Sequence, residues 1–224
     1  MTLLAIDTAT LQSGVALWRE GRVLAERRRL VTTHSDVLLA MIDEAFAEAR
    51  LAPSALEAIV CGAGPGSFTG LRIGLATAKG LCFALGKPLV MVSSLAALAA
   101  RAPDGRVCAT LDAFKSEVYA GLFTVAGGLP VVDDREVVLS PARLVAWLQQ
   151  APAAWVVGSG VAKYPELAAA GARLLDEEAG PRPADVARLG AARAAVGHFD
   201  DLATAAPAYI RPSEAELVKA QRSQ

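Results

Sequence analysis

The chain has 224 residues, of which 54% are hydrophobic and 20% are charged, and its formal net charge at pH 7 is −1. This composition excludes an intrinsically disordered protein, because the apolar fraction is high and the net charge is small. A pI of about 6.2 also argues against a dedicated nucleic-acid reader, which would carry clustered cations. The one dense basic run, Arg27-Arg28-Arg29, is typical of the solvent face of an edge strand.

The first hundred residues alternate between apolar runs, polar turns and amphipathic stretches. Three apolar runs separated by polar turns predict an antiparallel meander, and the next stretch repeats its apolar residues at the period of a helix. The glycine-rich loop Gly62–Gly70 then leads into a long apolar helix that Gly86 can cap. The predicted elements are strands at Leu3–Ile6, Ser13–Trp18, Arg22–Leu30, Ala58–Cys61 and Leu89–Val92, and helices at His34–Ala49, Thr69–Leu85 and Ser93–Arg101.

The pattern restarts after the turn Ala102–Gly105, which is the best candidate for a domain boundary. Cys108–Phe123 can be laid on Leu3–Trp18 without a gap, so that Asp112 falls on Asp7. We therefore expect a duplicated unit, with an N-terminal lobe over residues 1–103 and a C-terminal lobe and tail over residues 104–224. The later predicted elements are strands at Arg135–Leu139 and Ala154–Val157 and a helix at Pro141–Gln150, while the packing of Pro181–Gln224 is left open.

Two βββαβαβα lobes with mixed sheets, each with an acidic residue after its first strand, suggest the actin, sugar-kinase and Hsp70 (ASKHA) architecture. In that architecture two hairpin turns hold nucleotide phosphates between the lobes, and glycines let backbone N–H groups reach them. Here Ala9 and Phe114 stand where glycine is expected, so we predict a degraded nucleotide site with no bound cofactor. Its remnants would be Asp7, Thr8, Thr10 and Asp112.

No motif for a metal or a nucleophile is present. Cys61, Cys82 and Cys108 form no CxxC pair, which predicts reduced, buried thiols in a cytoplasmic protein. The two histidines form no HxxxH pair, and Gly158-Ser-Gly160 is not the GxSxG motif, so a peptidase ranks lowest. The N-terminus has no basic leader region, and no stretch approaches the roughly 18–20 charge-free apolar residues of a membrane span. We expect no membrane association.

The long helix after the glycine-rich loop carries a ridge of small residues. Gly70, Gly74 and Ala78 recur every four residues, and such a ridge lets another backbone approach closely. Much of the remaining circumference is apolar too, which indicates burial on more than one side. Two interpretations remain open: the helix lies inside the core of this chain, or it docks against a partner.

Leu4–Thr10, His34-Ser35, Gly62–Gly74 and the tail Tyr209–Ser213 resemble the bacterial TsaB (YeaZ) family over nearly the whole chain. The resemblance implies a part in making threonylcarbamoyladenosine (t6A) in tRNA, as a non-catalytic paralogue of TsaD. TsaD carries a metal and transfers the threonylcarbamoyl group. Relatives of TsaD have a metal-binding HxxxH after the strand that corresponds to Leu89–Val92. This chain has Ser-Ser-Leu-Ala-Ala there, so we expect neither a metal nor a catalytic residue.

The resemblance also implies partners. The first two helices of the N-terminal lobe would bind and activate TsaD, the ATPase TsaE would join the complex, and the chain alone would form a homodimer. Contact with tRNA would come mainly through the complex, and Gly74→Leu would weaken association while leaving the monomer folded. The alternative function is a small ATPase or kinase that uses Asp7 and Asp112. The residues expected at the partner interface are Leu38, Met41, Ile42, Gly70, Leu71, Gly74, Ala78 and Leu81.

Overall fold

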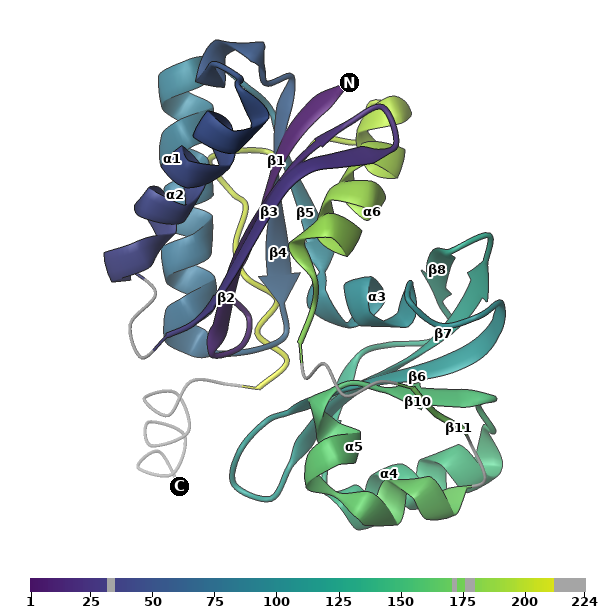
Figure 1. Ribbon diagram of the computed structural model, residues 1–224. Helices are drawn as coiled ribbons and strands as arrows, with labels where there is room; N and C mark the ends of the chain where they lie inside the picture. The colour runs from purple at the N-terminus through teal and green to yellow at the C-terminus, as the bar shows by residue number, and fades with distance from the viewer. Residues whose placement is uncertain (32–34, 171–172, 176–179, 212–224) are drawn as a thin grey trace.

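Two mixed β-sheets organise the chain, one in each lobe (Figure 1). The computed structural model describes residues 1–31, 35–170, 173–175 and 180–211. The first half contains β1 (Thr2–Asp7), β2 (Gln12–Arg19), β3 (Arg22–Leu30), α1 (Ser35–Ala49), the 3-10 turn η1 (Pro53–Ala55), β4 (Ala58–Gly64), α2 (Phe68–Leu85), β5 (Leu89–Ser93) and α3 (Ser94–Ala99). The second half contains β6 (Gly105–Asp112), β7 (Val118–Ala126), β8 (Leu129–Val132), β9 (Val137–Leu139), α4 (Pro141–Gln150), β10 (Trp155–Val157), α5 (Ser159–Lys163), η2 (Pro165–Ala170), β11 (Arg173–Leu175) and α6 (Pro183–Ala195).

The two sheets have the same topology, which confirms the predicted ASKHA architecture. The first has the order β3-β2-β1-β4-β5, and the second has the order β8-β7-β6-β10-β11. In each, the first strand lies between an antiparallel and a parallel neighbour: β1 between β2 and β4, and β6 between β7 and β10. The single third strand predicted at Arg135–Leu139 is two short strands, β8 and β9, which both pair with β7. His34, expected to begin the first helix, lies outside the described residues.

The second hairpin is one residue tighter than the first. Asp7 lies opposite Gly14, whereas Asp112 lies opposite Val118. The gap-free superposition of Cys108–Phe123 on Leu3–Trp18 would have placed Tyr119 there. It is therefore wrong by one residue along the second strand. Because successive side chains of a strand point to opposite faces, this offset also exchanges the faces that the matched residues occupy.

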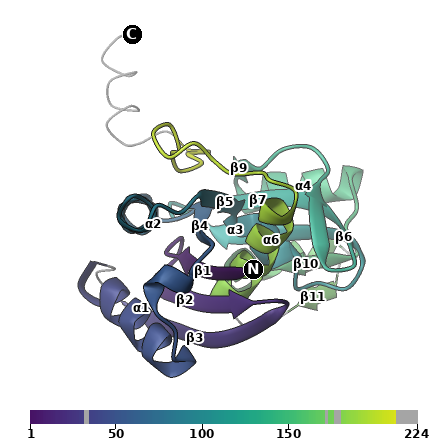
Figure 2. The same cartoon turned by 90° about the horizontal axis from the view of Figure 1, so that it is seen from above.

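Each sheet is covered on both faces, and the last helix of each half crosses to the other lobe (Figures 1 and 2). Alternation along β1 sends Leu4 and Ile6 toward α1 and α2, and Leu3 and Ala5 toward α6. The C-terminal helix α6 thus contacts β1, β2 and β5, while α3 contacts β6 and β7. Within the segment that sequence left open, α6 therefore packs on the first lobe, while the last described residue, Arg211, contacts the second lobe. A domain boundary near residue 103 remains a prediction.

Residues 199–211 form a strap that joins the two lobes. The Asp200 amide donates to the carbonyl of Leu89 on β5 at 2.8 Å, which holds the start of the strap on the first sheet. At its end, the Arg211 guanidinium donates to the Ala113 carbonyl at 2.9 Å and pairs with Glu117 at 2.8 Å, both in the second lobe. The strap therefore links the lobes in addition to the two chain connections, one between α3 and β6 and one between β11 and α6.

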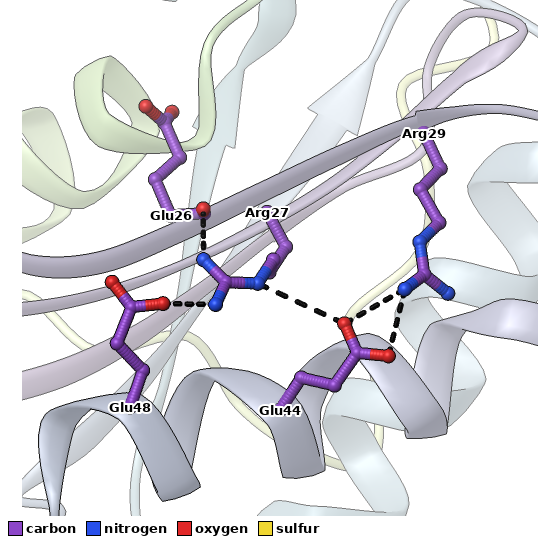
Figure 3. Close-up of polar contacts among 5 residues, drawn as sticks. All are labelled: Glu26, Arg27, Arg29, Glu44 and Glu48. Carbon is purple, nitrogen blue, oxygen red and sulfur yellow. Dashed lines mark hydrogen bonds and ion pairs between the residues drawn. The ribbon is translucent and has the colours of Figure 1, made fainter.

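The basic run on β3 is partly paired with acidic residues of α1 (Figure 3). Arg29 lies 2.7 Å from a Glu44 carboxylate oxygen, Arg27 lies 3.7 Å from the same carboxylate, and Arg27 also pairs with Glu48. These groups are partly exposed, so each pair adds little stability. The arginines of β3 thus face the glutamates of α1, and β3 is the edge strand of its sheet, as predicted.

The small-residue ridge of α2 packs against the β1–β2 turn of its own chain. Thr8 Oγ1 donates a hydrogen bond of 2.7 Å to the Gly70 carbonyl, and a Cβ added at Gly74 would overlap with the same hydroxyl. The helix begins with Ser67, whose hydroxyl accepts from the Gly70 amide, and ends at the predicted cap Gly86, with φ 63°. The ridge is thus an internal packing surface, and Gly74→Leu would disturb the monomer that it was expected to spare.

We predict that Gly74→Ala destabilises the fold by about 1–3 kcal/mol, because the methyl group overpacks the Thr8 contact. Rotating Thr8 away would break its bond to Gly70. The matched control is Gly80→Ala on the same helix, where an added Cβ meets no atom within 4 Å. That variant should gain about 0.5–1 kcal/mol from helix propensity. Urea unfolding followed by circular dichroism compares the two, and equal stability would contradict the packing argument.

Candidate functional site

The first of the two turns that could hold phosphate is closed by the chain itself. The glycine-rich loop lies on it: the Ser67 amide donates to the Ala9 carbonyl at 2.7 Å, and a Cβ at Gly66 would overlap with that carbonyl. Asp7 and Thr8 are buried, with exposures of 2% and 1%. The loop therefore acts as a cover over the turn rather than as a phosphate cradle.

Asp7 is a buried carboxyl that joins this turn to α3. Its Oδ1 accepts from the Ala9 amide at 3.1 Å, and its Oδ2 accepts from Ser94 Oγ at 3.2 Å. A Cβ at Gly62 would overlap with Oδ2, so β4 leaves no room for a ligand beside it. Burial raises the pKa of Asp7 from its ordinary value of 3.8 to about 7, and the two hydrogen bonds oppose that rise. Asp7 thus has a structural position and no access to solvent.

The second turn is open and has a different set of contacts. Asp112 pairs with Lys163 on α5 at 2.7 Å, and its amide donates to Ser159 Oγ at 3.0 Å. Phe114, which stands where glycine was expected, does adopt a glycine-like φ of 58°, and its side chain is 57% exposed. The turn therefore combines a left-handed backbone with an aromatic side chain at the mouth between the lobes.

The four residues expected as remnants of a nucleotide site lie in two different turns. A cavity of about 620 Å³ lies between the second turn, the start of α2 and the end of the strap. Asp112 lines it, whereas Asp7, Thr8 and Thr10 do not. An ATPase or kinase that used Asp7 and Asp112 together would need both carboxyls at one ligand, and only Asp112 faces this cavity.

The predicted partner residues lie mainly beneath the surface of α1 and α2. All but Leu81, which is partly buried, are buried in this chain. The opposite side of α2 is exposed instead, and Phe83 reaches 84% exposure. The first interpretation of the helix, burial in the core of this chain, is thus confirmed for one side, while docking against a partner stays a prediction for the exposed side. The buried residues are Leu38, Met41, Ile42, Gly70, Leu71, Gly74 and Ala78.

Sequence reasoning missed the exposed side of α2, because Cys82 and Phe83 are adjacent and both apolar, and only packing separates them. By length and composition alone, α2 would also pass as a membrane-spanning helix. Its packing on β4 and on the first turn accounts for the apolar residues of the buried side. The assignment of a partner surface to α1 and α2 stays a prediction.

The start of α3 occupies the place where the resemblance puts metal-binding histidines. Ser93 caps the helix by accepting from the Ala96 amide at 3.1 Å, and its hydroxyl donates to the half-buried carboxylate of Glu136 in the second lobe. Burial raises the pKa of Glu136 above its ordinary value. Across the described ranges, no three His, Cys, Asp or Glu side chains are grouped as metal ligands.

We predict a pH-dependent stability that Asp7→Asn removes. The pKa of Asp7 is higher in the folded chain than in the unfolded chain. Its contribution to stability is therefore complete below about pH 3.8 and is lost as the pH rises through about 7. The slope can reach about 1.4 kcal/mol per pH unit. Between pH 5 and 8, urea unfolding should show that the free energy of unfolding of Asp7→Asn rises relative to that of the wild type as the pH increases. The exposed control Asp104→Asn should keep a constant difference from the wild type. Parallel curves for all three chains would contradict the assignment.

Three comparisons with known proteins agree with this geometry. The TsaB protein of Bacillus subtilis, named a tRNA threonylcarbamoyladenosine biosynthesis protein, is 34% identical over 96% of both chains. A solved Pseudomonas aeruginosa structure, described as similar to peptidase YEAZ, has a TM-score of 0.84 and 37% identity, and covers 94% of this chain and 99% of its own. The activator of 2-hydroxyisocaproyl-CoA dehydratase from Clostridium difficile has a TM-score of 0.52 and is 10% identical, and the match covers 100% of this chain and 98% of the activator. This likeness shows the fold alone.

The family model described as TsaD, tRNA N6-adenosine threonylcarbamoyltransferase, matches residues 28–221. Of the tail motif Tyr209–Ser213, the structure describes the residues up to Arg211. From the extent of these matches, the chain belongs to the TsaB family of tRNA threonylcarbamoyladenosine biosynthesis proteins, within the wider TsaD-like family.

Proposed function

We propose that this chain is a non-catalytic cytoplasmic subunit that binds the threonylcarbamoyltransferase TsaD and activates it in t6A synthesis. TsaE joins the assembled complex, and tRNA is contacted mainly through that complex. The observation that carries the proposal is the two-sided packing of α2. One side closes the first turn, and the other leaves an apolar surface uncovered on the same helix. Such a surface on a folded chain is typical of a protein interface.

The uncovered side of α2 has the shape of a helix-docking surface. Ala76, Gly80, Phe83 and Ala84 are exposed and recur at three- and four-residue steps, so they share one face. The small residues let a second helix approach closely, and Phe83 projects beside them as a large apolar anchor. On the other predicted helix, α1, Leu39 is also exposed. These residues replace the buried ridge as the contact that we propose.

The same surface would pair two copies of this chain in the absence of TsaD. A homodimer and the TsaD heterodimer would then compete, because both would cover Phe83. The closed first turn and the serines at the start of α3 support a partner role rather than an active site. The alternative, a small ATPase or kinase, would require Asp7 to reach a phosphate, and Asp7 is buried beneath the glycine-rich loop.

We predict that tRNA modification requires the chain. The test combines TsaC, which makes the threonylcarbamoyl adenylate, with TsaD, TsaE, tRNA, threonine, bicarbonate and ATP, with and without this chain. Threonylcarbamoylated tRNA should form only when the chain is present, and the chain with tRNA alone should yield none. Equal modification in its absence would refute the activating role and would favour the ATPase alternative.

We predict that Phe83→Asp weakens TsaD binding about 30-fold or more, since an exposed aromatic anchor at an interface contributes about 2 kcal/mol or more. The free chain should unfold at the same urea concentration as the wild type, because Phe83 is 84% exposed. The matched control is Phe199→Asp, which changes an exposed aromatic residue at the start of the strap, outside the proposed surface. Titration calorimetry measures both. Wild-type affinity in a folded Phe83→Asp chain would remove this surface from the proposal.

A further inference from the structure

A separate groove of about 290 Å³ lies within the second lobe, between α4 and β9. On α4, the lining residues Arg143 and Trp147 are four positions apart, so they share one face of the helix. On the other wall, Val137 and Leu139 are two positions apart along β9, so they share one face of the strand. Both walls are regular elements, and the groove is therefore formed before any ligand arrives.

The floor of this groove is apolar and continues the core of the second lobe. Val137, Leu139 and Trp147 are half-buried and pack on the hydrophobic cluster to which α4 contributes the buried Leu144 and Leu148. Apolar surface that is still in contact with water at the base of a groove gains free energy when another apolar group covers it. The volume lies at the lower limit of small-molecule sites, about 300 Å³, so it suits a side chain that projects from a peptide.

Two guanidinium groups lie at the rim of the groove. Arg135 and Arg143 both line it and are exposed, and neither forms an ion pair with the residues that the structure describes. The nearby carboxylate of Asp133 is already paired with Arg106 at 2.7 Å. A guanidinium group binds a carboxylate through two parallel hydrogen bonds, which adds direction to the attraction of charge. The rim can therefore accept a carboxylate from outside the chain.

The rim also carries an acid, which favours a peptide over a polyanion such as RNA. Asp134 lines the groove and is exposed, so that two arginines and one aspartate leave a local charge of only +1. A nucleic acid would bring a row of phosphates next to this carboxylate, and like charges repel. A protein segment instead offers single carboxylates for the arginines, apolar side chains for the floor, and backbone N–H groups that Asp134 can accept.

This groove is distinct from both surfaces already described. None of its lining residues belongs to the Asp112–Lys115 turn or to the strap, so it is not part of the cavity between the lobes. Figures 1 and 2 both show α4 far from α1 and α2. A segment bound between α4 and β9 would thus leave Phe83 uncovered, and two proteins could bind the chain at the same time.

From these contacts we propose that the groove between α4 and β9 binds a short acidic segment of a partner protein. An apolar side chain of that segment covers the floor formed by Val137, Leu139 and Trp147. A neighbouring carboxylate is held by Arg135 and Arg143, as in other proteins that recognise acidic motifs with grouped arginines. The proposal rests on the groove alone and is independent of TsaD binding.

The first test uses the full wild-type chain, without TsaD, to select ligands from an mRNA-display library of random peptides. The enriched peptides should combine aspartate or glutamate with an adjacent apolar residue. A synthetic peptide of the most enriched sequence is then titrated by calorimetry, beside poly-uridine RNA. A selection that enriches no peptide, or peptides without acidic residues, overturns the proposal. RNA that binds more tightly than the peptide overturns it in favour of a nucleic-acid site.

The second test reverses the charge at the rim. Arg135→Glu and Arg143→Glu should each bind the selected peptide about tenfold more weakly, because a carboxylate loses its charged partner. A peptide with lysine in place of its acidic residues should bind these variants more tightly than the wild type. The matched control, Arg22→Glu, changes an exposed arginine of the first lobe and should have no effect. Wild-type binding by both rim variants would place the peptide elsewhere and overturn the proposal.

The third test reports on the floor. Binding of the peptide should change the tryptophan fluorescence of the wild-type chain, and Trp147→Phe should lose that change. Because Trp147 is half-buried and phenylalanine keeps an aromatic ring there, the variant should stay folded, which circular dichroism checks. A folded Trp147→Phe chain that shows the full fluorescence change would mean that the peptide does not cover the floor, and the proposed site would be wrong.

Discussion

The contact between the β1–β2 turn and the start of α2 is the constraint on which the first lobe depends. One hydroxyl, that of Thr8, bonds to the Gly70 carbonyl and fills the space above Gly74. This requires glycines on the helix, and it brings the glycine-rich loop down onto the turn. Two consequences follow together: the first turn is covered by the glycine-rich loop, and the helix is held with its other apolar side in solvent. The closure of the turn and the exposure of the surface thus have a common physical cause.

This constraint separates the two halves of a duplicated fold. In the first half, the loop packs on the turn, and the buried carboxyl of Asp7 accepts hydrogen bonds from the Ala9 amide and the Ser94 hydroxyl. In the second, α5 is short, and Asp112 meets Lys163 in a partly exposed ion pair. The architecture is therefore retained while the chemistry at its two turns has diverged. The open turn contributes to the cavity between the lobes, and the closed one contributes rigidity to the helix that carries Phe83.

Local sequence patterns predicted most of the fold, because strand alternation, helix period and caps are local properties. Two examples are the helix at Pro141–Gln150, whose start is marked by its proline, and the end of α2, which is marked by Gly86. Three features were beyond reach. The exposure of Phe83 beside buried Cys82 depends on which side meets the sheet. The left-handed φ of Phe114 contradicts its residue type. The packing of α6 on the first sheet pairs segments that no local period connects.

The predicted site residues fared unevenly for the same reason. The sequence marked Gly74 as a position of close approach, and the approaching group there is the side-chain hydroxyl of Thr8 rather than a backbone. The sequence could not tell that the approaching group belongs to the same chain, since Thr8 lies far away in sequence. The aromatic lining of the cavity could not be predicted from sequence either, because its residues come from three distant segments: Phe68, Phe114 and Tyr209.

The crossing of α6 to the first sheet has a consequence for synthesis on the ribosome. One face of β1, including Leu3 and Ala5, stays uncovered until Val186 and Leu189 have been made and have left the exit tunnel. The N-terminal lobe therefore cannot complete its core during translation of its own sequence, and an apolar sheet face must wait for nearly the whole chain. Such delayed, non-local closure slows folding and prolongs the exposure of sticky surface to chaperones. A nascent chain that stalls before α6 would be a substrate for quality control even though every residue of its first sheet is present.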